Sequence, residues 1–189
     1  MKIAIYGGTF DPIHNGHLIL ARDAVEKLGL DELVFVPNAT PPHRPGHVPA
    51  TPDARLEMVR AAVEGEPKFR VDDSEVRRGG ISYAIETVLA LKEKYPADAE
   101  MHYLIGQDNV DDLHTWRRID ELKLLVTFVV FTRSDFDSTH VLLKLDRRVD
   151  ISATEVRSRI AKGESIRYLV PEAVRQIIAA KKLYQETSH

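Results

Sequence analysis

The sequence predicts an α/β fold: a doubly wound, mostly parallel sheet of five to six strands flanked by helices, with a small C-terminal helical part. Three observations favour it. Short apolar runs alternate along the chain with longer segments whose apolar residues recur at helical spacing. A glycine turn joins the first apolar run to the first helical segment. The 189 residues are 43% hydrophobic and 29% charged, which suits one globular domain or one domain with a small appendage. The alternation of strands and helices makes the expected fold Rossmann-like.

The N-terminal elements form a strand–helix–strand unit. The apolar run at 3–6 predicts a buried strand, and the helical pattern that follows covers 16–28, where Gly29 ends it. A second strand is predicted at 33–36 and ends at Pro37. A crossover of this kind is right-handed and leaves its two strands parallel.

The second helix follows a proline-rich loop at 37–50. Thr51 supplies the N-cap of this helix and Pro52 its first helical position. Two arginines on the helix, Arg55 and Arg60, are expected to be solvated or paired rather than catalytic.

The middle of the chain continues the alternation. A third strand is predicted at 69–71 and a turn at 77–80, after which Ser82 caps a third helix. A fourth strand with its glycine turn covers 101–106. A helical stretch follows it and carries the only tryptophan, Trp116.

The last strands are shorter and less clearly marked. The apolar run at 126–131 predicts a fifth strand, and the polar segment 134–140 predicts a mobile loop. Short strands are candidates at 141–145 and at 149–151.

Composition limits the function classes. The formal net charge of −3 argues against non-specific nucleic-acid binding, and the absence of cysteine excludes disulfides and thiolate metal sites. The N-terminus carries no signal-peptide pattern and no apolar run is long enough to span a bilayer, so a cytoplasmic protein without membrane contact is expected. The whole chain, 1–189, is predicted to be one domain with a helical subregion at about 152–185.

The strongest stretch lies between the first strand and the first helix. It reads Gly7-Gly8-Thr9-Phe10-Asp11-Pro12-Ile13-His14-Asn15-Gly16-His17. Ligands of open α/β sheets bind at the carboxyl ends of the strands, and the N-terminus of a helix attracts phosphate. His14 and His17 stand three apart, so both rings can face one point near that helix end. An isolated H-x-x-H would also suit a surface pair or two metal ligands, but the longer pattern favours a phosphate site.

A second stretch lies near the C-terminus and reads Ile151-Ser152-Ala153-Thr154-Glu155-Val156-Arg157. Ser152 and Glu155 match a capping box, so a helix is predicted to start at Ser152 and to offer a second phosphate-binding end. Arg157 lies one turn into this helix, and Pro171 opens the last one.

These two stretches resemble the nucleotidyltransferase superfamily marked by H-x-G-H and by a C-terminal I-S-x-T-x-x-R. Enzymes of that superfamily join a nucleoside triphosphate to a phosphate-bearing acceptor and release pyrophosphate. The resemblance implies His14, His17 and Arg157 as catalytic residues, with ring N–H groups and a guanidinium that neutralise phosphoryl oxygens. Mg²⁺ would be held by the ATP phosphates, without protein ligands. The expected ATP-binding set is Gly7, Gly8, Thr9, Phe10, His14, His17, Gly106, Asp108, Ser152, Thr154 and Arg157.

The middle of the chain resembles the bacterial nicotinate-nucleotide adenylyltransferases, which make deamido-NAD from ATP and nicotinate mononucleotide. The matching segments are Pro41-Pro42-His43-Arg44, Ser82-Tyr83-Ala84-Ile85-Glu86-Thr87, and Ile105-Gly106-Gln107-Asp108-Asn109 followed by Leu113 and Trp116. An indole face such as that of Trp116 stacks well on an electron-poor pyridinium ring. The expected nicotinate-nucleotide set is His43, Arg44, Ser82, Tyr83, Ala84, Trp116 and Arg117.

Three positions depart from the family pattern. Ala153 replaces a serine of the C-terminal motif, and Ala84 replaces a threonine whose hydroxyl could donate to the nicotinate carboxylate. Arg117 follows Trp116 where an aromatic residue is expected, and it either approaches the carboxylate or is merely exposed. These departures leave the choice between the acid and the amide acceptor open, whereas the reaction class stays as the resemblance implies.

Several alternatives stay open at this stage. The same transfer to nicotinamide mononucleotide is the runner-up, because of Ala84. Phosphopantetheine as acceptor and a cytidylyltransferase fit the segment 82–116 less well. A nucleotide-sensing regulator without turnover would be expected to lack one of the histidines or Arg157, and a scaffolding module would need neither phosphate site. Related enzymes include dimers, so the resemblance admits a homodimer.

Overall fold

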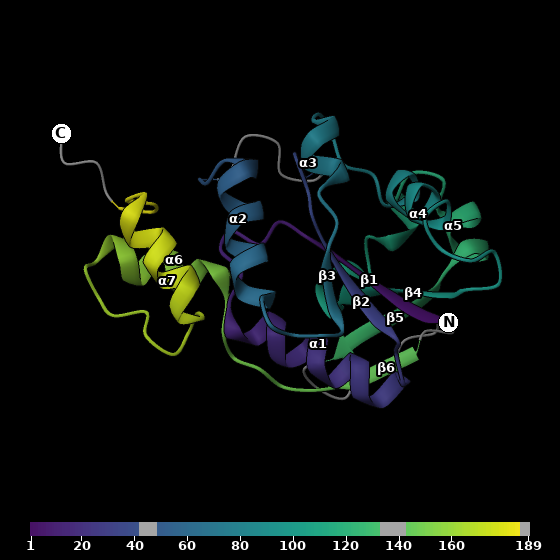
Figure 1. Ribbon diagram of the computed structural model, residues 1–189, viewed down its shortest axis with the longest axis horizontal. Coiled ribbons are helices and arrows are strands. Elements are labelled where there is room, and N and C mark those ends of the chain that lie inside the picture. Colours follow the sequence, from purple (N-terminus) through teal and green to yellow (C-terminus); the bar gives the residue numbers. More distant parts are fainter. Residues whose placement is uncertain (42–48, 133–142, 186–189) are drawn as a thin grey trace.

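A six-stranded sheet lies at the centre of the computed structural model (Figure 1), which describes residues 1–41, 49–132 and 143–185. The strand order is β3-β2-β1-β4-β5-β6, and every neighbouring pair is parallel. The strands are β1 (Lys2–Gly8), β2 (Glu32–Pro37), β3 (Phe69–Val71), β4 (Glu100–Gly106), β5 (Thr127–Thr132) and β6 (Leu143–Asp146). The predicted doubly wound sheet is confirmed.

Helices cover both faces of the sheet because side chains alternate along each strand. Ala4 and Tyr6 of β1 face the core shared with α1, α2, α6 and α7, whereas Ile3 and Ile5 face the core shared with α4 and α5. The helices are α1 (Asn15–Leu28), α2 (Pro52–Val63), α3 (Ser74–Arg78), α4 (Ala84–Lys92), α5 (Ile119–Leu125), α6 (Ala153–Ala161) and α7 (Glu172–Ala180), with 3₁₀ turns η1 (Gln107–Asn109) and η2 (Leu113–Thr115). None of the helices in these ranges has the length and apolarity needed to cross a membrane.

The C-terminal helices α6 and α7 lie together at one end of the molecule, next to α2 and far from α4 and α5 (Figure 1). Val156 of α6 and Val174 and Ile178 of α7 are buried in the same cluster as residues of α1 and α2. The helical subregion therefore extends the core on one face of the sheet. It also brings the second motif, at the start of α6, toward β1.

The chain order places a binding crevice beside β1. From β1 the chain runs outward through β2 and β3, and then it returns to the other side of β1 to form β4. Such a reversal leaves the carboxyl ends of β1 and β4 open between the flanking loops, which is where ligands of these sheets bind.

Two strand candidates and one turn differ from the structure. The strand candidate at 149–151 is wrong, because these residues pair with no described strand and only lead into α6. The candidate at 141–145 is seen in part as β6, and the loop at 134–140 lies outside the described residues. The turn at 77–80 is preceded by the unpredicted helix α3, and only Gly79-Gly80 forms the turn, both with positive φ.

The third predicted helix begins two residues later than expected. Tyr83, not Ser82, is the N-cap of α4, because the Ser82 hydroxyl accepts a hydrogen bond from the Ala39 amide (3.0 Å) instead of capping. The helical stretch after β4 is two 3₁₀ turns, and Trp116 ends the second of them. The caps predicted at Thr51 and Ser152 are confirmed, since each hydroxyl accepts from the amide three residues on.

Candidate active site

A cleft of about 880 Å³ opens at the carboxyl ends of β1 and β4. Every predicted site residue that the structure describes lines it: Gly7, Gly8, Thr9, Phe10, His14, His17, Ser82, Tyr83, Ala84, Gly106, Asp108, Trp116, Arg117, Ser152, Thr154 and Arg157. His43 and Arg44 lie outside the described residues. The two motifs near opposite ends of the chain and the segment between them thus meet at one cavity.

The two histidines are held in a fixed relation at the start of α1. The His14 amide donates to Nδ1 of His17 (3.2 Å), and the two rings stack with their centroids 3.7 Å apart. A neutral imidazole that accepts at Nδ1 carries its proton on Nε2. His17 is therefore oriented as an Nε2–H donor. Gly16 is required here because a Cβ would lie 2.9 Å from Nδ1 of His14.

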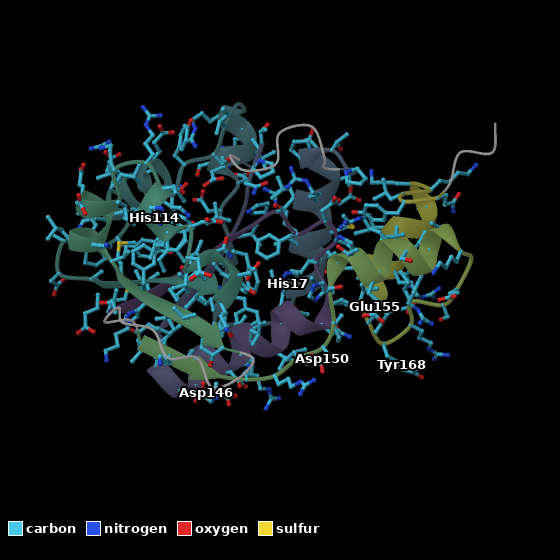
Figure 2. The ribbon with its side chains drawn as sticks, turned by 180° about the vertical axis from the view of Figure 1, so that it is seen from behind. His17, His114, Asp146, Asp150, Glu155 and Tyr168 are labelled. Atoms are coloured by element: carbon cyan, nitrogen blue, oxygen red, sulfur yellow. The ribbon has the colours of Figure 1, made fainter. Side chains whose placement is uncertain are left out.

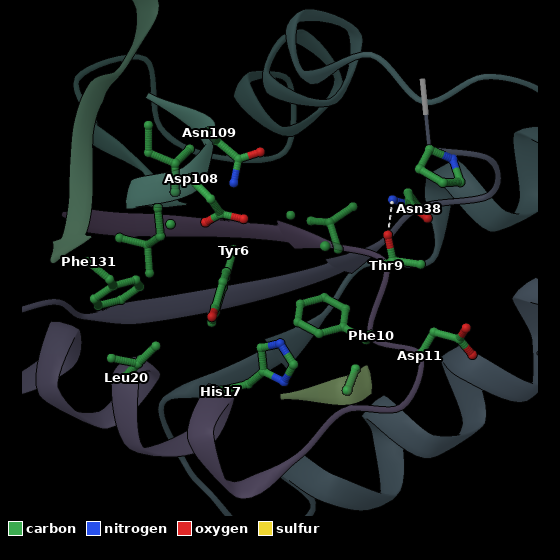
Figure 3. A pocket seen from close by; sticks show the side chains of 18 of the residues that line it. Tyr6, Thr9, Phe10, Asp11, His17, Leu20, Asn38, Asp108, Asn109 and Phe131 are labelled. Carbon is green, nitrogen blue, oxygen red and sulfur yellow. Dashed lines mark hydrogen bonds between the residues drawn. The ribbon is translucent and has the colours of Figure 1, made fainter. Parts of the chain in front are cut away.

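Aromatic rings surround His17 and keep it neutral. The rings of Tyr6 and Phe10 lie 6.0 and 5.1 Å from it, centroid to centroid, and Figure 3 shows it beside Phe10 with Asp108 on the far side of β1. Burial, and secondarily the charge of His14, lower the pKa of His17 well below its usual value. Near neutral pH its ring can donate one hydrogen bond to a phosphoryl oxygen without carrying charge.

The N-terminus of α1 offers fewer free donors than the sequence predicted. The Asn15 amide donates to the Leu169 carbonyl (2.8 Å), and the His17 amide donates to the His14 carbonyl (3.0 Å). The Asn15 side chain also donates to the Tyr168 carbonyl (2.6 Å). The segment before α7 thus occupies part of the helix end, and the histidine rings become the more important donors.

Arg157 reaches the β1 turn from the second motif. Its guanidinium donates to the Asp11 carbonyl (2.7 Å) and to the Thr154 hydroxyl (3.3 Å). Ser152 caps α6 from the same side of the cleft by accepting from the Glu155 amide (3.1 Å). The planar fork of Arg157 is held in place by backbone on one side and leaves donors for an anion on the other.

The other end of the cleft is aromatic and carries a cation. The half-buried Trp116 ring packs edge-on against Tyr103 and Phe128, with centroids 5.8 and 6.2 Å away. The Arg117 guanidinium lies 4.6 Å from the centroid of the Tyr83 ring. Trp116 is partly a core residue, yet it also lines the cavity.

The predicted carboxylate site at the start of α4 needs a correction. The Ser82 amide donates to the Thr40 carbonyl (3.0 Å) and is therefore not available to a ligand. The Glu86 amide donates to the Tyr83 carbonyl (3.0 Å), whereas the amides of Ala84 and Ile85 precede the first acceptor that the helix itself offers. Arg117 is paired with Glu86 (3.3 Å), which also faces Arg78 (3.5 Å).

Two buried charged residues near the site were missed. Glu75 lines the cleft, is 5% exposed and accepts hydrogen bonds from the hydroxyls of Thr87 and Ser82, while burial raises its pKa. No signal in the short segment around it distinguishes it from a surface glutamate. Arg55 is not solvated, because it is fully buried, and its guanidinium is instead paired with backbone carbonyls and the Asn38 side-chain oxygen. Arg60 is paired as expected, with Asp73 (2.6 Å).

Comparison with known proteins places the chain in a family. The Cytidylyltransferase-like family model matches residues 5–159. A probable nicotinate-nucleotide adenylyltransferase of Lactiplantibacillus plantarum is 44% identical over 98% of this chain and 89% of its own length, and one of Shouchella clausii is 45% identical over 99% and 98%. The chain belongs to the nicotinate-nucleotide adenylyltransferase family. It is thus a nucleotidyltransferase, which confirms the predicted family and enzyme class.

Solved structures share the fold of this adenylyltransferase family member. A Plasmodium falciparum nicotinic acid mononucleotide adenylyltransferase complexed with NaAD superposes with a TM-score of 0.78 over 97% of both chains, at 20% identity. A putative nicotinate-nucleotide adenylyltransferase of Vibrio parahaemolyticus gives a TM-score of 0.71 at 21% identity, over 98% of this chain and 96% of the other. At these identities the likeness concerns the fold.

Proposed function

We propose that this enzyme transfers the adenylyl group of ATP to nicotinate mononucleotide and releases pyrophosphate, giving deamido-NAD for NAD biosynthesis. The observation that carries the proposal is the set of side chains that line one cleft. Phosphate donors of two motifs, His17 and Arg157, line it together with the aromatic pair Tyr83 and Trp116. A dinucleotide is assembled from two nucleotides whose phosphates meet, and this cleft offers phosphate donors and an aromatic end in one cavity.

The reaction needs alignment and charge neutralisation more than a base. A phosphate oxygen of nicotinate mononucleotide attacks the α-phosphorus of ATP, a new P–O–P bond forms, and the α–β bond breaks with its electron pair going to pyrophosphate. The acceptor oxygen is already anionic, so no proton has to leave. We assign the Nε2–H of His17 and the ring of His14 to the transferring phosphoryl group, and the fork of Arg157 to the leaving phosphates.

The remaining residues of the phosphate end position the nucleotide. Gly7 and Gly8 end β1, and Thr9 and Phe10 form the turn after it. Gly106 ends the neighbouring strand β4, and Asp108 follows it in η1. Ser152 and Thr154 add polar groups at the start of α6. We propose that these eight residues, with the histidines and Arg157, hold ATP.

Magnesium fits this site as a partner of the nucleotide. Within the part of the chain that the structure describes, no three His, Asp or Glu side chains form a group able to hold a metal ion. Mg²⁺ keeps several waters and binds phosphates readily. We therefore propose that the ATP phosphates hold it, and that it neutralises the charge of the leaving pyrophosphate.

The acceptor end suits a pyridinium ring bearing an acid. Trp116 and Tyr83 offer ring faces, and the first amides of α4 at Ala84 point a helix N-terminus at a carboxylate. Arg117 adds a cation beside Tyr83. His43 and Arg44 follow the cleft residue Pro41 in the chain and complete the proposed set. Ala84, which lacks the threonine hydroxyl, favours nicotinamide mononucleotide as the second candidate acceptor.

The deciding experiment compares the two acceptors directly. Pyrophosphate release is measured with ATP, Mg²⁺ and either nicotinate or nicotinamide mononucleotide, with and without EDTA. The proposal expects at least a tenfold higher kcat/KM for the acid, equivalent to about 1.4 kcal/mol, and loss of release with EDTA. Equal or reversed preference would move the acceptor to the amide while keeping adenylyl transfer. Release with neither acceptor would contradict the proposal and favour a nucleotide-sensing role.

A further inference from the structure

Arg55 of α2 is the largest of the fully buried side chains among the described residues, and it does not line the cleft. Its guanidinium donates four hydrogen bonds. Nη1 donates to the Thr9 carbonyl (2.7 Å) and to Oδ1 of Asn38 (3.2 Å), Nη2 to the Ala39 carbonyl (2.9 Å), and Nε to the Ala50 carbonyl (3.3 Å). A cation is thus buried beneath the active site without being part of its wall.

The four acceptors belong to loops that follow neighbouring strands. Thr9 lies in the turn after β1, and Asn38 lies just after β2. Asn38 also binds the β1 turn directly, since its amide donates to the Gly8 carbonyl (3.0 Å) and its side chain donates to the Thr9 hydroxyl (3.2 Å; Figure 3). Arg55, which lies outside the cleft, therefore holds the loop after β1 and the loop after β2 at a fixed spacing.

The network continues to the acceptor end of the cleft. The Ala39 amide donates to the Ser82 hydroxyl (3.0 Å), and the Ser82 amide donates to the Thr40 carbonyl (3.0 Å). Ser82 directly precedes Tyr83, the N-cap of α4. An unbroken chain of hydrogen bonds thus joins the phosphate-binding turn to the start of α4, and Arg55 is at its centre.

Only a guanidinium can make these contacts together. It presents five N–H donors in a rigid plane, whereas lysine presents three donors from one point. Burial lowers the pKa of Arg55, and the nearby Asp11, which is 5% exposed, opposes that shift. Removing the side chain would leave buried oxygens without donors.

We propose that Arg55 is a positioning residue that sets the distance and angle between the ATP half and the acceptor half of the active site. This proposal rests on the proposed adenylyl transfer, in which an acceptor oxygen must approach the α-phosphorus in line with the leaving group. Misplacement by about 1 Å can cost about 100-fold in rate even when each substrate still binds.

The test compares Arg55→Lys with Met58→Ala. Met58 is one turn further along α2 and is fully buried, but it contributes only packing. Melting temperature, the Kd of each substrate alone and kcat are measured for both variants, with kcat taken well below either melting temperature. Arg55→Lys is expected to lower kcat at least about tenfold while each Kd stays within about threefold. Met58→Ala is expected to melt earlier and to keep kcat within about twofold.

Equal kcat losses in the two variants, or a kcat of Arg55→Lys within twofold of wild type, would overturn the proposal. If Arg55→Lys does not fold, Asn38→Ala removes two links of the network and carries the same expectation for kcat and Kd. If the wild-type enzyme turns over neither acceptor, the proposed function fails separately. In that case, hydrogen exchange tests the positioning role of Arg55 without turnover. The backbone amides at 8–11 and 38–40 should exchange at least about tenfold faster in Arg55→Lys than in Met58→Ala. Equal exchange rates would overturn the proposal.

Discussion

The two ends of the cleft are built in different ways. At the phosphate end, each motif is organised by local contacts, as in the bond between the His14 amide and His17 or the cap of α6 by Ser152, and the bond from Arg157 to the Asp11 carbonyl joins the two motifs. At the acceptor end, Trp116 and Tyr83 come from separate segments and meet only through the sheet and α4. The chemistry shared by the superfamily is encoded locally, whereas the choice of acceptor depends on assembled surfaces.

The two ends of the cleft also differ in how their polar and charged side chains are held. His17 is kept neutral in a ring of aromatic side chains, and Arg157 is held by the Asp11 carbonyl. Arg117, by contrast, is exposed and shares Glu86 with Arg78. Exposed ion pairs contribute little and rearrange readily. We infer that the acceptor end tolerates substitutions such as Ala84, while the phosphate end does not.

The largest effect is expected at the phosphate end, when the His17 side chain is removed. His17→Ala should lower kcat by about 100- to 1000-fold, the loss typical of a preorganised donor to a developing oxyanion, with the melting curve retained. His114→Ala is the control, because His114 is exposed, lies outside the cleft and is well separated from His17 in Figure 2. Pyrophosphate release is the measurement, and near-normal turnover of His17→Ala would refute the role.

A second substitution tests the acceptor end alone. Trp116→Ala should raise the KM for nicotinate mononucleotide about tenfold, within the 1–3 kcal/mol that aromatic stacking on a base contributes, and leave the KM for ATP unchanged. Trp116→Phe, which keeps a ring face, should recover most of the loss. Equal increases in both KM values would show that the two ends are not separable.

The pKa of His17 predicts how stability depends on pH. Because folding lowers this pKa, the unfolded chain binds a proton below pH 6.5 that the folded protein does not. Stability is therefore nearly constant well above that pH and falls as pH drops through 6.5 toward the folded pKa, with a slope that approaches about 1.4 kcal/mol per pH unit. Urea unfolding at pH 7.5, 6.0 and 5.0 should show this slope in wild type and a shallower one in His17→Asn. Equal slopes of unfolding free energy against pH in the two proteins would contradict this role of His17.

The smallest effect concerns the choice between acid and amide. Ala84→Thr restores a hydroxyl at the first position of α4 and should raise the ratio of kcat/KM for the acid over the amide about fivefold, the value of a hydrogen bond worth about 1 kcal/mol. Arg117→Ala should lower the same ratio by a similar factor. Initial rates with both acceptors measure it, and an unchanged ratio in both variants would place acid recognition elsewhere in the cleft.

Signals between residues close in sequence predicted several elements of the fold. The Thr51 and Ser152 caps and the strand at 101–106 depend on residues close in sequence, and the structure confirms each. The predicted glycine turn is placed differently, because Gly7 and Gly8 end β1 and the positive φ of the turn falls on Phe10. The errors have tertiary causes. Ser82 does not cap α4 because a residue 43 positions away supplies a better donor for its hydroxyl.

The sequence by itself determined the fold class, the two phosphate-directed motifs and the family, because each is set by short-range spacing of glycine, histidine and capping residues. Only the tertiary structure decided that Arg55 and Glu75 are buried beside the site, since burial depends on which loops close over a side chain. It also decided that the α1 amides are partly occupied by the segment before α7. A helical pattern cannot tell an arginine facing water from one facing four buried oxygens, because the spacing is the same in both cases.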